Sequence, residues 1–76
     1  GWGIQVGAFK TKDISEQQAK RASRILKIRN KQILTPQTAN YYRSRIYGFY
    51  SKKAAQNACR KLKQSKIGCL VIPKEN

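Results

Sequence analysis

Two short stretches decide the fold: residues 4–9 read IQVGAF, and residues 44–49 read SRIYGF. Each has alternating side chains, then one or two small residues, then a phenylalanine. The segments that follow, SEQQAKRASRIL (residues 15–26) and SKKAAQNACRKL (residues 51–62), are identical at five of twelve positions. The chain therefore contains two copies of one unit, a strand followed by a helix.

Each copy carries the pattern of an amphipathic helix. Ser15 and Ser51 are the expected N-cap residues, because a serine hydroxyl can accept a free backbone N–H of the first turn. Gln18, three residues after Ser15, completes a capping box. Small and apolar residues then recur on one face, at Ala19, Ala22, Ile25 and Leu26 in the first helix and Ala55, Ala58, Cys59 and Leu62 in the second. Alanines on that face let both helices lie close against a sheet.

Alternation along the two repeated strands divides their side chains between two faces. In the first copy we expect Ile4 and Val6 to face inward, and Gln5 and Gly7 to face outward. The same rule applied to the second copy places Ser44 and Ile46 inward and Arg43, Arg45 and Tyr47 outward.

Two further strands complete the pattern, from Gln32 to about Thr38 and from Gly68 to Ile72. Pro36 favours an edge position for the first of them, because proline cannot donate to a strand ladder. The order β-α-β-β-α-β predicts an α+β fold, ferredoxin-like (ribonucleoprotein-like), with right-handed crossovers. Two helices would cover one face of a four-stranded sheet, with the repeated strands adjacent at its centre. The other face, the bare face, would then carry Gln5 next to Arg43 and Arg45.

The two cysteines, Cys59 and Cys69, have two interpretations. Cys59 lies on the inner helix face, and Cys69 should point inward with Val71, leaving Leu70 outward, so the two sulfurs are brought toward each other. A disulfide would close a loop of about ten residues and contribute roughly 2–3 kcal/mol. It would also place the protein outside the reducing cytosol. The alternative is a pair of packed thiols. A zinc site is excluded, because the chain has no histidine and no further cysteine.

The charge balance indicates an acidic partner. Lys and Arg number 17 against 3 acidic residues, for a net charge of +14. Most of these cations belong to helix surfaces, where we expect solvation or a general attraction to an anionic wall. Without histidine or paired carboxylates, catalysis by these residues, a metal site or a cofactor is not expected. No run of about 18 apolar residues is present, so we expect no membrane insertion.

Three motifs carry a resemblance to a known family: WGIQVGAF (residues 2–9), YRSRIYGFYSKKAA (residues 42–55) and IGCLVI (residues 67–72). In this order and spacing they resemble the SPOR domain (sporulation-related repeat) of bacterial cell-envelope proteins. The resemblance implies binding of peptidoglycan glycan strands that lack stem peptides, through the bare face. Carried over by position, the ligand-binding residues are Gln5, Tyr41, Arg43, Arg45 and Leu70.

The sequence departs from the family pattern at three points of the second strand, and one of them is Gly48, where the family often has proline. Tyr47 stands where the family usually has glycine, so its ring either adds to the binding face or blocks part of it. Ser44 replaces an apolar residue, which we expect to weaken the core slightly.

The resemblance also implies a context for the domain. The form RSRIYGF with the cysteine pair is most similar to SPOR domains of D-alanyl-D-alanine carboxypeptidases. We expect residues 1–76 to be one monomeric, non-catalytic domain excised from a longer envelope protein, periplasmic and targeted to the division septum. The parent chain would be an enzyme even though this domain is not.

Two other functions fit the same pattern. A βαββαβ sheet with basic and aromatic residues is also the plan of an RNA-recognition motif, in which bases stack on the central strands. Its sequence signature is absent, and the first central strand offers Gln5 and Gly7 outward, with no ring. The second alternative is a protein-interaction or autoinhibitory module of the parent enzyme.

Overall fold

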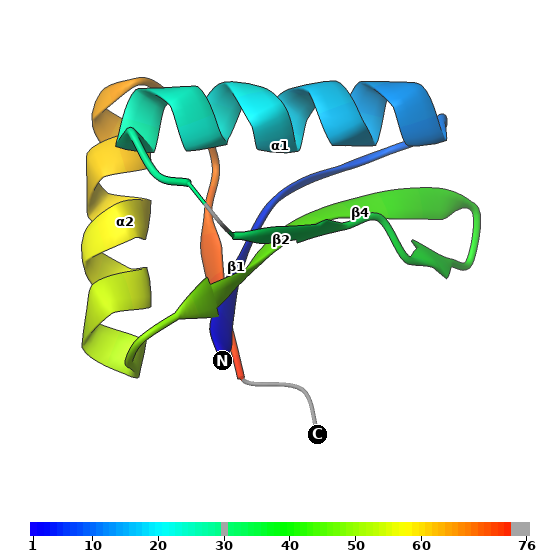
Figure 1. The fold of residues 1–76 in the computed structure, drawn as a ribbon. Coiled ribbons are helices and arrows are strands. Elements are labelled where there is room, and N and C mark those ends of the chain that lie inside the picture. The colour runs from blue at the N-terminus through cyan, green and yellow to red at the C-terminus, as the bar shows by residue number, and fades with distance from the viewer. Residues whose placement is uncertain (30, 74–76) are drawn as a thin grey trace.

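The computed structural model describes residues 1–29 and 31–73, which form two helices and five strands. Along the chain these are β1 (Trp2–Phe9), α1 (Lys12–Leu26), β2 (Gln32–Leu34), β3 (Gln37–Thr38), β4 (Tyr41–Phe49), α2 (Lys52–Gln64) and β5 (Leu70–Ile72). The sheet order is β2-β4-β1-β5, with β3 pairing β4, and every pairing is antiparallel. Both helices cover the same side of the sheet (Figure 1). The predicted α+β ferredoxin-like fold is confirmed, with the two repeated strands at the centre.

The third predicted strand is divided in two at Thr35 and Pro36. Both pieces, β2 and β3, pair with β4. Proline has no N–H to donate, but the carbonyl of Pro36 accepts a hydrogen bond from the backbone N–H of Arg43 at 2.8 Å. The chain therefore stays attached to β4 across the interruption, as expected of an edge strand.

The two helices begin differently, although their sequences are repeats. The Ser51 hydroxyl accepts a hydrogen bond from the N–H of Ala54 at 3.1 Å, so Ser51 is the N-cap of α2, as predicted. The prediction for Ser15 is wrong, because α1 begins one turn earlier. There Thr11 is the N-cap and accepts from the N–H of Ile14 at 3.3 Å.

Ser15 instead forms a buried polar link between α1 and β4. Its hydroxyl donates to the carbonyl oxygen of Tyr42 at 2.6 Å, and the Ser44 hydroxyl donates to the carbonyl oxygen of Ser15 at 2.7 Å. Both serines are fully buried. Ser44 is therefore more than a weak substitute for an apolar residue. Its hydroxyl is hydrogen-bonded, and so it is buried without the cost of an unsatisfied polar group.

Ser15→Ala should lower the free energy of unfolding by about 1 kcal/mol, because it removes the bond to Tyr42. The matched control is Ser23→Ala in the same helix, a half-buried serine for which the same gain in helix propensity applies. Urea unfolding of both variants measures the difference. A Ser15 variant as stable as the Ser23 variant would show that this link contributes nothing.

The core lies between the helices and the sheet. Its largest apolar side chains with no exposed surface are Ile4, Ile46 and Leu62, from β1, β4 and α2. Cys59 of α2 is joined by a disulfide to Cys69, just before β5, with the two Cα atoms 5.2 Å apart. This bond ties the second helix to the edge strand that follows it.

Two kinds of feature are absent from residues 1–29 and 31–73. None of the helices in this part of the chain is both long and apolar enough to cross a membrane. Nor do the same residues contain a group of three or more His, Cys, Asp or Glu side chains that could hold a metal ion.

Candidate ligand-binding face of the sheet

The bare face, opposite α1 and α2, is organised by the pairing of the two central strands. Gln5 of β1 pairs with Arg45 of β4, and residues paired in an antiparallel ladder share one face. The neighbouring strands extend this pair into a row across the sheet. In order from β2 to β5, the row is Leu34, Arg45, Gln5 and Leu70.

The centre of this row is a hydrogen-bonded pair. Nε of Arg45 donates to Oε1 of Gln5 at 2.9 Å. The bond fixes the plane of the guanidinium and orients the Gln5 amide, because its oxygen faces the arginine. The Nη groups of Arg45 and the Nε2 group of Gln5 remain able to donate. Two side chains 40 residues apart in sequence thus present a fixed set of donors at the middle of the bare face.

Arg43 comes two residues before Arg45 in β4. It pairs with Ala8 and therefore does not lie beside Gln5. Its Nε donates to Oγ1 of Thr38 at 2.7 Å, which holds the side chain toward β3. Tyr41, two residues earlier, is 40% exposed and also pairs with Thr38. The prediction that both arginines neighbour Gln5 therefore holds for Arg45, whereas Arg43 and Tyr41 form a separate group at the β3 end.

Strict alternation placed Gly7 on the bare face, and this is wrong. The β1 ladder shifts its register between Gln5 and Gly7, so that Gly7 pairs with the buried Ser44 and Ala8 pairs with Arg43. Such a β-bulge adds one residue to one strand and reverses the alternation after it. Ala8, with its small side chain, is consequently the β1 residue beside Arg43 on the bare face.

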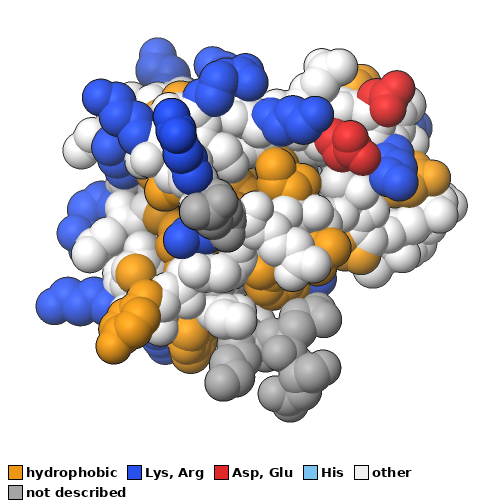
Figure 2. All heavy atoms as spheres, viewed as in Figure 1, with side chains coloured by type: hydrophobic (Ala, Val, Ile, Leu, Met, Phe, Trp, Pro, Cys, Tyr) orange, Lys and Arg blue, Asp and Glu red, His pale blue; other side chains and the backbone are white. Residues whose placement is uncertain are grey.

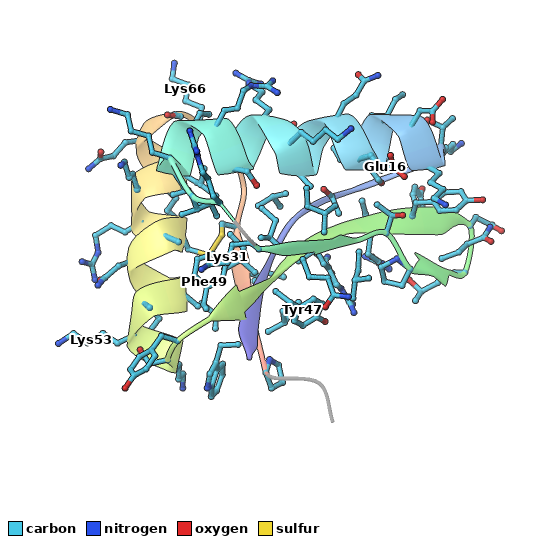
Figure 3. All side chains as sticks on the ribbon, in the orientation of Figure 1. Glu16, Lys31, Tyr47, Phe49, Lys53 and Lys66 are labelled. Atoms are coloured by element: carbon cyan, nitrogen blue, oxygen red, sulfur yellow. A yellow bond between two sulfur atoms is a disulfide. The ribbon has the colours of Figure 1, made fainter. Side chains whose placement is uncertain are left out.

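Tyr47 lies on the bare face, as predicted, but it is only 5% exposed. Its ring covers Gly3, the residue with which it pairs, and Figure 3 shows the side chain on the side of the sheet away from the helices. A Cβ atom at Gly3 would lie 2.6 Å from Cδ1 of Tyr47. The ring thus occupies the space that a side chain at position 3 would need, and it presents little surface to a ligand.

Gly3→Ala should displace the Tyr47 ring, because a contact of 2.6 Å is far shorter than van der Waals distance. We expect a loss of stability of about 1–3 kcal/mol from overpacking. We also expect nitration of Tyr47 by tetranitromethane to rise toward that of Tyr50, which is 97% exposed. Peptide mapping by mass spectrometry measures both tyrosines. Gly68→Ala is the control, since a Cβ there meets no atom within 4 Å, and equal nitration of Tyr47 in the two variants would contradict the expected displacement.

Leu70 forms the other end of the central row. It is 65% exposed and follows the disulfide-bonded Cys69 directly. Beside it, a groove of about 280 Å³ opens between α2 and β5, with the disulfide in its lining. An apolar side chain is thus presented next to the polar Arg45–Gln5 pair, on the other side of Gln5.

Sequence reasoning placed Gln5, Arg45, Tyr47, Leu70 and Ile72 on this face but did not give the rows that they form across the sheet. A second row, parallel to the first, consists of Gln32, Tyr47, Gly3 and Ile72. Leu34 and Thr38 were missed as well. These positions could be found only from the register between neighbouring strands, and the pattern of a single strand does not contain that register. Once Gln5 is paired with Arg45, counting along β2 and β5 gives the remaining positions.

The fold and this face together define a small ligand-binding domain of ferredoxin-like topology, with two helices behind the sheet and a polar row across its front. The sequence matches the SPOR domain family over residues 1–73, and the chain belongs to that family. Its structure is similar to the solution structure of the peptidoglycan binding domain of the B. subtilis cell wall lytic enzyme CwlC. The two share 26% sequence identity with a TM-score of 0.71, covering 97% of this chain and 89% of that one. No curated protein matches the sequence at a significant level.

Proposed function

We propose that this SPOR domain is a non-catalytic module that binds peptidoglycan, at glycan strands lacking stem peptides, through its bare face. The observation that carries the proposal is the Arg45–Gln5 pair at the centre of that face. Membership of the SPOR family and the similarity to the peptidoglycan binding domain of CwlC support the choice of polymer.

The chemistry of a stripped glycan suits these side chains. Removal of the stem peptide leaves a lactyl carboxylate on one of the two alternating sugars. The Nη groups of Arg45 can donate to that carboxylate, and a charge-assisted bond of this kind is stronger than one between neutral groups. Nε2 of Gln5 can donate to an acetamido carbonyl. An attached peptide would turn the carboxylate into an amide and add bulk, so it weakens both contacts.

The flanks of the central pair provide contacts for sugar faces and for a second carboxylate. Tyr41 contributes an exposed ring edge and Arg43 a second guanidinium at the β3 end, while Leu70 contributes apolar surface at the β5 end. Because the Tyr47 ring is nearly buried over Gly3, we assign it a packing role on this face rather than a contact with sugar. Glycan would therefore cross four strands along the row from Leu34 to Leu70, with the group of Arg43 and Tyr41 at one side of that row.

Base stacking finds little support on this face. The bare-face residues of β1 are Gly3, Gln5 and Ala8, none of which has a ring. The ring of Tyr47 is covered. An RNA-recognition motif stacks bases on exposed rings of its central strands, and this arrangement favours glycan over nucleic acid.

The place of action follows from the proposed ligand and from the disulfide. Disulfides persist in oxidising compartments outside the cytosol, and the Cys59–Cys69 bond therefore supports a location in the cell envelope. In this proposal the domain is periplasmic. It brings its parent enzyme, a D-alanyl-D-alanine carboxypeptidase, to the division septum, where amidases produce stripped strands.

Sedimentation with purified sacculi tests the proposed ligand. We expect the domain to be retained on amidase-treated sacculi at least about tenfold more strongly than on untreated ones, because treatment exposes the carboxylates that Arg45 binds. Retention that is equal on the two preparations would refute the preference for stripped strands. Absence of retention on both would refute peptidoglycan binding altogether.

A further inference from the structure

Eight exposed cations lie on the C-terminal halves of the two helices, away from the bare face. They are Lys20, Arg21, Arg24 and Lys27 of α1 and its C-cap, and Arg60, Lys61, Lys63 and Lys66 of α2 and the turn after it. The C-terminal ends of α1 and α2 meet at one corner of the molecule (Figure 1). In Figure 2 the blue Lys and Arg side chains gather over this corner. We call these eight residues the helix-end cluster.

The acidic side chains of the described residues lie elsewhere. Asp13 and Glu16 belong to the first turns of α1. With a rise of 1.5 Å per residue, Glu16 is about 12 Å along the helix axis from Arg24. Figure 3 shows Glu16 and Lys66 near opposite ends of α1, and α2 has no acidic residue at all. Glu16 is one turn, about 6 Å along the axis, from Lys20, whereas the other cations of the cluster on the two helices have no acidic residue within one turn.

The helix dipole explains only part of this arrangement. Cations in the last turn of a helix are favourable, and Arg24, Lys61 and Lys63 occupy such positions. The effect fades within one turn, and Lys20 and Arg21 lie beyond it. Like charges three or four residues apart also repel each other and destabilise a helix. Repulsion among these cations therefore lowers the stability of the folded domain, and a bound polyanion would remove that repulsion.

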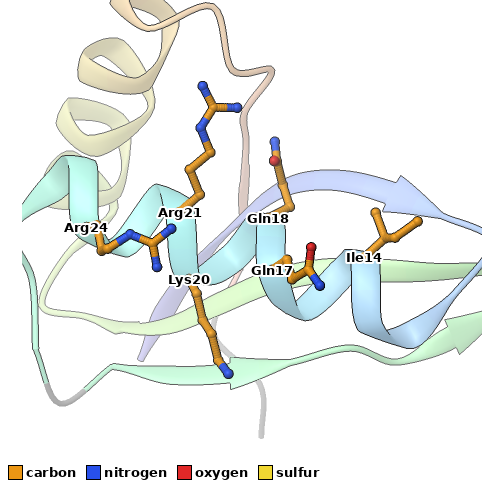
Figure 4. A pocket seen from close by; sticks show the side chains of 6 residues that line it. All are labelled: Ile14, Gln17, Gln18, Lys20, Arg21 and Arg24. Atoms are coloured by element: carbon orange, nitrogen blue, oxygen red, sulfur yellow. The ribbon is translucent and has the colours of Figure 1, made fainter.

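The α1 half of the cluster surrounds a hollow on the solvent side of that helix. Lys20, Arg21 and Arg24 line it together with Ile14, Gln17 and Gln18 (Figure 4). Its volume is about 430 Å³, enough for more than one phosphate group. Three cations and two amides around one open hollow offer donors to phosphate oxygens and no acceptor carboxylate.

The surroundings of the cluster indicate which polyanion it fits. The large exposed apolar side chains of the described residues are Ile14, Tyr41, Tyr50 and Leu70. Ile14 and Tyr50 lie at the N-terminal ends of the helices, and the other two lie on the bare face. Ile14, which also lines the α1 hollow, is the one of these four side chains beside the cluster. A single apolar side chain gives little anchorage in a membrane, and no exposed ring for base stacking lies beside the cluster, so phosphate charge is its main attraction.

We propose that the helix-end cluster binds a flexible linear polymer of phosphates or phosphodiesters that carries no bases. The two helix ends form a corner, which a flexible chain can follow and a flat membrane surface cannot. The cluster shares no residue with the proposed glycan-binding row. One domain can therefore hold a glycan on its sheet and an anionic polymer behind its helices.

Long-chain inorganic polyphosphate is the probe, with affinity measured by isothermal titration calorimetry at two salt concentrations. The cluster variant is Arg24→Gln/Lys61→Gln/Lys63→Gln. The control, Lys10→Gln/Lys52→Gln/Lys53→Gln, removes the same charge at the other ends of the helices. We expect the cluster variant to lose about tenfold or more in affinity and the control about twofold at most, with a smaller salt dependence in the cluster variant only. Equal losses in the two variants would overturn the proposal, because net charge alone would then account for binding.

Two further binding measurements distinguish polyphosphate from other molecules that carry phosphate groups. Single-stranded DNA of matched charge should bind no more tightly than polyphosphate, and tighter binding of DNA would overturn a base-free ligand. Vesicles with anionic headgroups should bind less tightly than polyphosphate, and the reverse would assign the cluster to a membrane. Arg45→Ala should bind polyphosphate as the unmodified domain does. Since no peptidoglycan is used, this test can fail without affecting the proposed glycan binding.

Discussion

Arg45→Ala is expected to weaken binding of the domain to amidase-treated sacculi by about tenfold to a hundredfold. A hydrogen bond to a charged group contributes roughly 1.5–3 kcal/mol, and Arg45 would donate such bonds to the exposed carboxylate. The substitution also releases the Gln5 amide, whose oxygen accepts from Arg45 at 2.9 Å. Bound fractions in sedimentation, measured over a range of sacculus concentrations, give the change in affinity.

Three variants make this result specific to the site. Arg21→Ala, in α1, removes the same charge away from the bare face and should bind within about twofold of the unmodified domain, because exposed charges contribute little. Arg45→Lys keeps the charge but loses the planar fork, so we expect an intermediate loss. Gln5→Ala combined with Arg45→Ala should cost less than the sum of the single losses, since the two side chains contact each other. Binding by Arg45→Ala equal to that of Arg21→Ala would show that the site is elsewhere.

Removal of the disulfide has the largest expected effect on stability. Cys59→Ser/Cys69→Ser should lower the free energy of unfolding by about 2–3 kcal/mol, because it frees a closed loop of ten residues in the unfolded chain. A domain of this size has about 4–11 kcal/mol in total. With a urea dependence near 1 kcal/mol per molar, the midpoint should fall by roughly 2–3 M.

Reductant provides the control for this prediction. Dithiothreitol should lower the urea midpoint of the unmodified domain to that of the double variant and leave the variant itself unchanged. Leu70 directly follows Cys69 in the chain, so we also expect glycan binding to weaken when the bond is lost, though by less than in Arg45→Ala. An unmodified domain whose midpoint does not respond to reductant would contradict the assigned role of the bond.

The repeat made most of the fold predictable. Two copies of a strand–helix unit in a chain of this length lead to a sheet whose centre is the repeated pair, and alternation gave the correct face for Gln5, Arg45 and Tyr47. The same repeat led to a wrong N-cap prediction at Ser15. Aligning it with Ser51 implied a shared role in capping, whereas α1 has two more residues than α2, 15 against 13, and begins earlier. Similar sequences were thus placed in different local surroundings.

For the candidate site, the sequence predicted which residues of one strand share a face, but not which residues of two strands lie side by side. Arg43 and Arg45 share a face by alternation, but the choice between them as partner of Gln5 depends on the register of β1 against β4. That register is shifted by a bulge at residues 6–7, which no local pattern indicated. The burial of Tyr47 depends in the same way on the glycine opposite to it. In each case the deciding contact joins residues about 40 positions apart.

Local patterns in the chain were sufficient for the kinds of element, their order and the faces of the central strands. These properties follow from side-chain periodicity and from turn and cap chemistry, which act over a few residues. Contacts between distant segments decided the rest: the Arg45–Gln5 pair, the Ser15–Ser44 link, the disulfide and the burial of Tyr47. Register, close packing and hydrogen bonding between strands depend on atoms brought together only when the whole sheet and both helices are in place.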